Sequence, residues 1–226
     1  GGTSNTAFGK NAGDALDSGG NYNVFIGEEA GTGITVSDDN VAIGYNAFFR
    51  STTQADKNVA IGSNAMSGNN TTADVDSCVV IGYDALSGTL TTAADGTIAI
   101  GHQAGKAITS GAGNIAIGYT ALQGHETGHS NTVIGYEAMS DTDAATVLDS
   151  DFNVAIGAYS MNGQWGTAVS EFNVAVGANT MKAAMNGAIN NVGVGYSALA
   201  ALTEGDSNIA IGTNALLSAN TASENI

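Results

Sequence analysis

The stretch that decides the fold is Asn40-Val41-Ala42-Ile43-Gly44-Tyr45-Asn46-Ala47, one of twelve versions of the pattern Asn-Val-Ala-Ile-Gly-x-x-Ala. Successive copies lie 17 to 22 residues apart along the 226-residue chain. A period of this size is typical of stacked coils, so we predict a single repetitive domain over residues 1–226. Because the repeat begins almost at the first residue, we expect a segment of a longer fibre protein. The glycines that mark the copies are Gly9, Gly27, Gly44, Gly62, Gly82, Gly101, Gly118, Gly135, Gly157, Gly177, Gly195 and Gly212.

Within each copy two β-branched residues flank a small one, as Val41 and Ile43 flank Ala42. This alternation with a period of two predicts a short strand in which Val and Ile share one face. We expect that face to be the core. The small residue between them indicates that another layer approaches closely. The isoleucines directly before a repeat glycine are Ile26, Ile43, Ile61, Ile81, Ile100, Ile117, Ile134, Ile156 and Ile211.

The residues around the strand predict how the chain turns and stacks. The glycine indicates a positive φ or the close approach of a neighbouring backbone. An asparagine four residues earlier predicts a ladder of stacked amides, since this side chain bonds nearby backbone and tolerates the left-handed region. A small residue three positions after the glycine, usually followed by a larger apolar one, predicts a second inward-facing element. The remaining residues, rich in Ser, Thr, Gly, Asn and Asp, are predicted to be surface turns.

Composition excludes several classes of partner. The formal net charge is −16, which would repel phosphate backbones and anionic lipid, so we expect no binding of nucleic acid. The sequence has no apolar run of 18 residues, so we expect no membrane insertion by this segment. The single cysteine, Cys78, occupies a position where ten of the twelve copies have asparagine, which favours a structural role over a reactive thiol. No cofactor motif is present.

The apolar content of one coil favours an assembly of several chains. Each coil offers one Val, one Ile, one Ala and one larger residue, which is little for a core enclosed by one chain. Three chains around a shared axis would let each coil bury an apolar face against its partners. We therefore predict an all-β parallel β-roll or β-solenoid of about twelve short coils, intertwined as a homotrimer. Stacking at about 4.8 Å per coil would make it roughly 55 to 60 Å long.

The repeat also resembles a known family. Asn-Val-Ala-Ile-Gly-x-x-Ala resembles the head repeat of trimeric autotransporter adhesins of the YadA type. The stretches Asn5 to Gly13 and Asn114 to Leu122 look even more like the repeats of phage tail fibres. The resemblance covers essentially the whole chain and implies a left-handed, trimeric, non-enzymatic β-roll, extracellular or on a virion, with a role in attachment. The adhesin heads repeat at a shorter interval than this chain.

Few residues have the spacing of a chemical site. His125 and His129 are spaced like a helical metal pair, but glycines flank them and predict a solvated loop. Paired aspartates could offer oxygen ligands to Ca²⁺, yet no EF-hand or related motif is present. They could also serve glycoside hydrolysis, although they fall in loops. These pairs are Asp38 and Asp39, Asp74 and Asp76, Asp141 and Asp143, and Asp149 and Asp151.

Aromatic residues are the candidate surface contacts. Trp165, in a glycine-flanked loop, is the best single candidate for an exposed contact, and covering a neighbouring coil is its structural alternative. Five tyrosines directly follow a repeat glycine and should stack in a row, either as a packing ladder or as a contact surface for sugars or protein. They are Tyr45, Tyr83, Tyr119, Tyr136 and Tyr196.

Three functions are compatible with these features. The first is a homotrimeric structural and adhesive fibre segment, with host cell-surface glycan or protein as its target. The second is a monomeric β-solenoid enzyme that degrades polysaccharide. The third is a solenoid subunit that stacks end to end into a filament. Sedimentation or native mass spectrometry would distinguish the first from the second.

Overall fold

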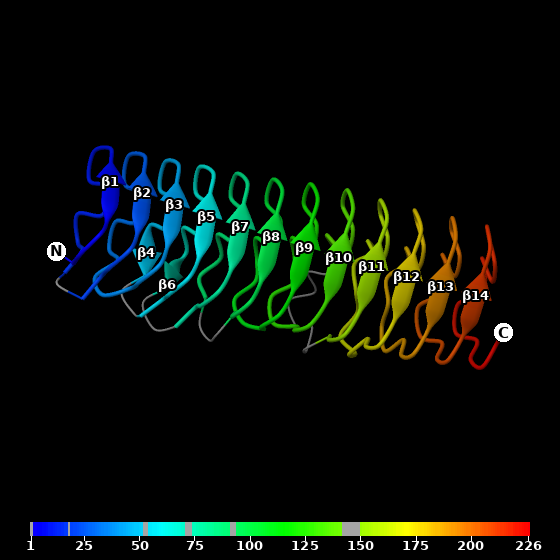
Figure 1. Ribbon diagram of the computed structural model, residues 1–226. Helices are drawn as coiled ribbons and strands as arrows, with labels where there is room; N and C mark the ends of the chain where they lie inside the picture. The colour runs from blue at the N-terminus through cyan, green and yellow to red at the C-terminus, as the bar shows by residue number, and fades with distance from the viewer. Residues whose placement is uncertain (1, 18, 52–53, 71–73, 91–93, 142–149) are drawn as a thin grey trace. The chain divides into compact units, whose positions relative to one another are not determined.

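The computed structural model describes residues 2–17, 19–51, 54–70, 74–90, 94–141 and 150–226. Within them the chain forms strands and turns and no helix, which confirms the predicted all-β solenoid. The chain divides into two compact units, residues 1–113 and 114–226. In each unit the coils follow one another in chain order, so every strand lies beside that of the next coil (Figure 1). The single domain over residues 1–226 remains a prediction.

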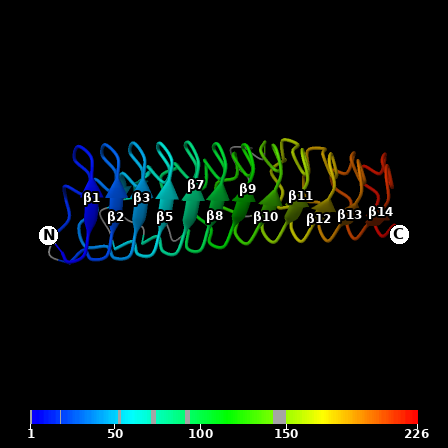
Figure 2. The same cartoon turned by 45° about the horizontal axis from the view of Figure 1, so that its top comes forward.

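Each repeat copy forms a three-residue strand, and neighbouring strands pair in parallel (Figure 2). The strands of the first unit are β1 (Thr6–Phe8), β2 (Val24–Ile26), β3 (Val41–Ile43), β5 (Val59–Ile61), β7 (Val79–Ile81) and β8 (Ile98–Ile100). Those of the second unit are β9 (Ile115–Ile117), β10 (Thr132–Ile134), β11 (Val154–Ile156), β12 (Val174–Val176), β13 (Val192–Val194) and β14 (Ile209–Ile211). A separate parallel pair, β4 (Arg50–Ser51) and β6 (Asn69–Asn70), joins two coils of the first unit. Equivalent repeat positions pair directly, as Val41 does with Val59.

The two faces of the strands are the reverse of the sequence-based expectation. In β3 the middle residue Ala42 is fully buried, whereas Val41 and Ile43 are only partly buried. The middle residue is likewise the buried one in every three-residue strand from β2 to β14. The prediction that the face of Val and Ile is the core is therefore wrong for the interior of a single coil, while its placement at the shared axis of several chains stays a prediction.

The thinness of the coil explains the reversal. The strand lies directly over the returning part of its own and the neighbouring coil, as predicted from the small middle residue. At Gly193, in the middle of β13, an added Cβ would lie 2.9 Å from Thr180 Cγ2 and 3.3 Å from Met181 Cε. Only a small side chain fits between these layers, so the larger β-branched residues point outward.

Larger side chains from the returning segment fill the interior. Met66 and Leu122, four residues after their repeat glycines, are fully buried. Both have left-handed backbones, with φ of 55° and 54°. This conformation costs about 1–2 kcal/mol, which burial of a Leu or Met side chain, worth about 1.5–3 kcal/mol, offsets. The second inward element is therefore confirmed, with Phe48, Met66, Leu86, Leu122, Met139, Met161, Met181 and Leu199 as its buried large residues.

A third row of buried residues comes from segments that the sequence predicts to be surface turns. These residues stand seven or eight positions after a repeat glycine, and we call them the plug row. The plug row comprises Ile34, Leu90, Ile108, His125, Trp165, Met185 and Leu202. With this row seven of the coils enclose a core of their own. The prediction that one coil offers too little apolar side chain for a core is therefore wrong for these coils.

The repeat glycine meets both expectations. Gly62 has a φ of 130°, which favours glycine over residues with a side chain. A Cβ added there would lie 2.7 Å from the carbonyl oxygen of Gly82 in the next coil. The glycines therefore allow successive coils to stack in backbone contact at the corner.

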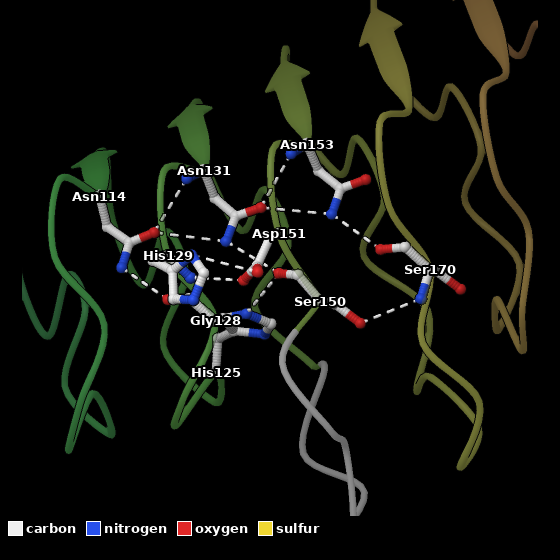
Figure 3. Close-up of polar contacts among 9 residues, drawn as sticks. All are labelled: Asn114, His125, Gly128, His129, Asn131, Ser150, Asp151, Asn153 and Ser170. Carbon is white, nitrogen blue, oxygen red and sulfur yellow. Dashed lines mark hydrogen bonds and ion pairs between the residues drawn. The ribbon is translucent and has the colours of Figure 1, made fainter.

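The predicted asparagine ladder is present in both units. Asn131 Nδ2 donates to the carbonyl oxygen of Ser150 at 3.0 Å, and Asn131 Oδ1 accepts the N–H of Asn153 at 2.9 Å (Figure 3). The ladder asparagines themselves are not left-handed. Instead the residue before each one is, as at Ser130 and Phe152 with φ of 57° and 56°. The ladder contains Asn5, Asn23, Asn40 and Asn58 in the first unit and Asn114, Asn131, Asn153, Asn173, Asn191, Asn208 and Asn225 in the second.

Cys78 takes the place of a ladder asparagine. Its N–H donates to Asn58 Oδ1 at 2.9 Å, and its Sγ lies 3.3 Å from the carbonyl oxygen of Ala94. Burial raises the pKa of the thiol to about 12, so Cys78 stays protonated and unreactive near neutral pH. The structure supports the structural role predicted from the sequence.

We expect Cys78→Asn to stabilise the first unit by about 1 kcal/mol, because an amide would replace a weak thiol donor. Its Nδ2 would reach the Ala94 carbonyl oxygen, which Sγ already approaches at 3.3 Å. Thermal unfolding of Cys78→Asn, with Cys78→Ser as the control for loss of sulfur, measures the effect. A midpoint at or below that of the serine variant would contradict it.

Candidate interaction surface

An apolar stripe runs along the outer face of the sheet in each unit, and we call it the outer stripe. It is formed by the first and third residues of the strands, mostly Val and Ile. Ile26 and Ile134 are 37% and 36% exposed, although each lies between stripe residues of two neighbouring coils. All nine predicted isoleucines lie in this stripe. Most of the other stripe residues are partly exposed, and a contiguous apolar surface of this kind is a candidate interaction site.

The residues directly after the repeat glycines flank the outer stripe on one side, and we call them the post-glycine row. The five predicted tyrosines lie in this row and are between 45% and 54% exposed. The rings of Tyr119 and Tyr136 stack at 5.2 Å between centroids, and Tyr83 stacks on His102 at 5.3 Å. Ser63, and farther along Ala158 and Ala178, interrupt the row.

The stacking of the rings determines which parts of the tyrosine side chains a ligand could contact. Tyr119 and Tyr136 lie 10° from parallel, so each covers one face of the other. The edge of Tyr159 lies against Tyr136 at 5.5 Å. A hydrogen bond to Glu137 raises the pKa of the Tyr136 hydroxyl. Tyr119 and Tyr136 thus present mainly ring edges and hydroxyl groups, whereas a sugar stacks best on an open ring face.

Trp165 is not an exposed contact, and its burial supports the alternative, a structural role. Its side chain is 1% exposed and its Nε1 donates to the carbonyl oxygen of Met161 at 3.3 Å. The ring lies in the plug row, with the edge of His125 at 6.3 Å. Its position seven or eight residues after the glycine, shared with Ile34 and Leu202, was the signal that could have identified it as core.

His125 and His129 do not form a metal pair. His125 is 2% exposed, and its Nε2 lies 3.1 Å from the carbonyl oxygen of Ser150. A carbonyl oxygen only accepts, so this nitrogen carries the proton. His129 lies at the surface, where its N–H donates to Asp151 Oδ1 at 2.8 Å and its Nδ1 lies 3.1 Å from Asp151 Oδ2 (Figure 3).

Ser150, His129 and Asp151 lie near one another, a combination that the sequence did not single out. Their side-chain hydrogen bonds join the backbones of neighbouring coils, which is a structural role. Ser150 Oγ accepts the N–H of Ser170 at 3.1 Å and is directed toward the next coil, away from His129 (Figure 3). A nucleophilic serine would need its hydroxyl beside the imidazole, so this cluster does not have the arrangement for nucleophilic catalysis.

The aspartates of the first unit form a second ladder. Asp38 Oδ1 accepts the N–H of Asn21 at 2.6 Å, and Asp56 Oδ1 accepts the N–H of Asp38 at 2.8 Å. Asp76 and Asp95 continue the series. These carboxylates therefore bind backbone of the preceding coil. Of the other paired aspartates, Asp39, Asp74 and Asp141 are exposed, while Asp143 and Asp149 lie outside the described residues. Among the described residues, no three His, Cys, Asp or Glu side chains are grouped to hold a metal ion.

Comparison with known proteins found no matching family model, no matching curated protein and no matching solved structure. In the described part of the chain no helix is long and apolar enough to cross a membrane.

Proposed function

We propose that this chain is a non-enzymatic structural segment of a surface fibre, a phage tail fibre or a trimeric adhesin, that presents attachment sites to host glycan or protein. The outer stripe is the observation that carries the proposal. The seven coils with a plug residue already enclose a core to which Val and Ile on the opposite face do not contribute. A second apolar layer outside a complete core supports association with further chains.

The dimensions of the outer stripe favour three chains. A stripe of the first and third residues of a strand is about 7 Å across. A flat contact between two sheets would require a wider apolar face, whereas three chains around an axis need only one narrow edge from each. The likeness of the repeat to trimeric adhesin heads and tail fibres agrees with this number. A surface of net charge −16 suits a solvated, extracellular fibre.

The proposal predicts a trimer in native mass spectrometry at micromolar concentration, and Ile134→Glu should dissociate it. Each chain would otherwise bury an unpaired carboxylate at the interface, at a cost of about 3–5 kcal/mol. The fold of the separate chain should tolerate the change, because the side chain of Ile134 is 36% exposed there. Ala184→Glu, which adds the same charge at an exposed position away from the stripe, is the matched control. A wild-type monomer would refute the proposal and leave the monomeric alternative.

A further inference from the structure

A second row of exposed residues flanks the outer stripe on the side opposite the post-glycine row. It consists of the residue before each ladder asparagine, or before Cys78 in its place, and we call it the pre-asparagine row. Phe152 and Phe172 belong to it and are each 48% exposed. Both have left-handed backbones, with φ of 56° and 57°, which is unfavourable for a bulky residue. Their rings stack on each other at 5.3 Å, which still leaves half of each side chain in water.

No coil has an aromatic ring in both rows, and most coils have one in a single row. The coils with Ser4 and Lys10, Lys57 and Ser63, and Ser207 and Thr213 have a ring in neither row. In the second unit the phenylalanines before β11 and β12 share their coils with alanines in the post-glycine row, and the tyrosines after β10 and β13 share theirs with small polar residues. The pairs are Ser130 with Tyr136, Phe152 with Ala158, Phe172 with Ala178, and Asn190 with Tyr196. In the first unit Tyr22 accompanies Glu28, Asp39 accompanies Tyr45 and Ser77 accompanies Tyr83. Each of these coils thus has one exposed ring, on one side of the outer stripe or on the other.

The complementarity does not arise within one chain. The two rows stand on opposite sides of a three-residue strand, which alone separates them by about 10 Å. A ring in one row therefore does not occupy the space of a ring in the other row of the same chain. The exchange of large and small residues between the rows therefore supports a contact in which the two rows belong to different chains.

We propose that the pre-asparagine row of one chain packs against the post-glycine row of a second copy of this chain, in parallel and at the same coil level. The inference rests on the proposed trimer. In a closed ring of identical chains, one side of each subunit contacts the opposite side of its neighbour, and equivalent coils lie at equal height. Phe172 then lies over Ala178 of the neighbouring copy, and no level has to accommodate two rings.

Disulfide formation between two single variants tests this contact. Phe172→Cys and Ala178→Cys proteins, refolded together and mildly oxidised, are expected to give a covalent two-chain species on a non-reducing gel. Phe172→Cys mixed with Thr213→Cys is the matched control, because Phe172 precedes β12 and Thr213 follows β14, so their coils are two levels or about 10 Å apart. Buried Cys78 is present in every protein, and the unsubstituted chain provides its background.

The outcomes separate this inference from the proposed function. A monomer in native mass spectrometry overturns both. A trimer in which Phe172→Cys and Ala178→Cys do not cross-link overturns the contact alone, as does cross-linking of Phe172→Cys with itself, which would indicate a two-fold interface. As a second readout, Ala178→Phe should dissociate the trimer by placing two rings at one level, and adding Phe172→Ala should restore it. Dissociation that Phe172→Ala does not reverse would also overturn the contact.

Discussion

Replacing Gly135 with alanine is expected to cost at least about 4 kcal/mol of unfolding free energy, or to prevent folding of the second unit. The added Cβ would lie 2.5 Å from the carbonyl oxygen of Gly157 and 2.6 Å from its carbonyl carbon. These backbone atoms have little freedom to move, because the N–H of Gly157 donates to Ile134 at 2.8 Å. The φ of 147° adds a conformational cost for any residue with a side chain.

Gly212→Ala separates the steric clash of the added Cβ from the conformational cost of the positive φ. Gly212 has a similar φ of 127°, yet an added Cβ would meet no atom within 4 Å. We expect this variant to lose only the conformational part, about 1–3 kcal/mol. Chemical denaturation followed by far-UV circular dichroism, at one protein concentration for all variants, measures both. Equal losses at Gly135 and Gly212 would mean that backbone strain alone, rather than coil stacking, requires the glycine.

Much of the coil could be predicted from the sequence because its determinants are local. The alternation around Ala42 gives a strand, and the glycine and asparagine positions have few physical explanations other than those found. Their spacing also gives the register, since stacking aligns one copy with the next. The structure confirms these features for strands and ladders in both units.

The inner and outer faces of the strand could not be predicted by the same reasoning. Alternation shows that two faces differ, but it does not say which one lies inside. Hydrophobicity favoured Val41 and Ile43 over Ala42, and the thin interior of the coil selected the smaller residue instead. The apolar outer face that results is the observation from which we propose a partner chain, and the alternation alone does not distinguish such a face from a core.

The burial of Trp165 and His125 could not be predicted from the loops that contain them, because these loops vary in length. The composition of the loops predicts surface positions for both residues, whereas both are buried in the plug row. Counting from the repeat glycine, rather than from loop composition, would have aligned them with Ile34 and Ile108. The sequence also contains the pairing of Phe152 with Ala158. Its interpretation as a contact depends on the structure, which shows that the two rows lie on the outside of the coil.

Replacing Asn173 with alanine is expected to cost about 3–5 kcal/mol, because several buried hydrogen bonds depend on this one amide. Asn173 Nδ2 donates to the carbonyl oxygen of Ala188 at 2.7 Å, and Asn173 Oδ1 accepts the N–H and Nδ2 of Asn191, both at 3.0 Å. Ala188 and Asn191 are fully buried, so water does not readily replace the lost partner. Denaturation under the conditions used for the glycine variants measures the loss.

Asn131→Ala provides a matched comparison within the same unit and should cost about 1–3 kcal/mol less than Asn173→Ala. The Ser150 carbonyl oxygen accepts from Asn131 Nδ2, but it also accepts from His125 Nε2 at 3.1 Å and would keep that bond. Among the described contacts, the Ala188 carbonyl oxygen accepts a hydrogen bond from Asn173 Nδ2 and from no second donor. If the two variants lose equal stability, satisfaction of the buried carbonyl is not the main contribution of the ladder. A larger loss at Asn173 would show that each amide holds the next coil through that bond.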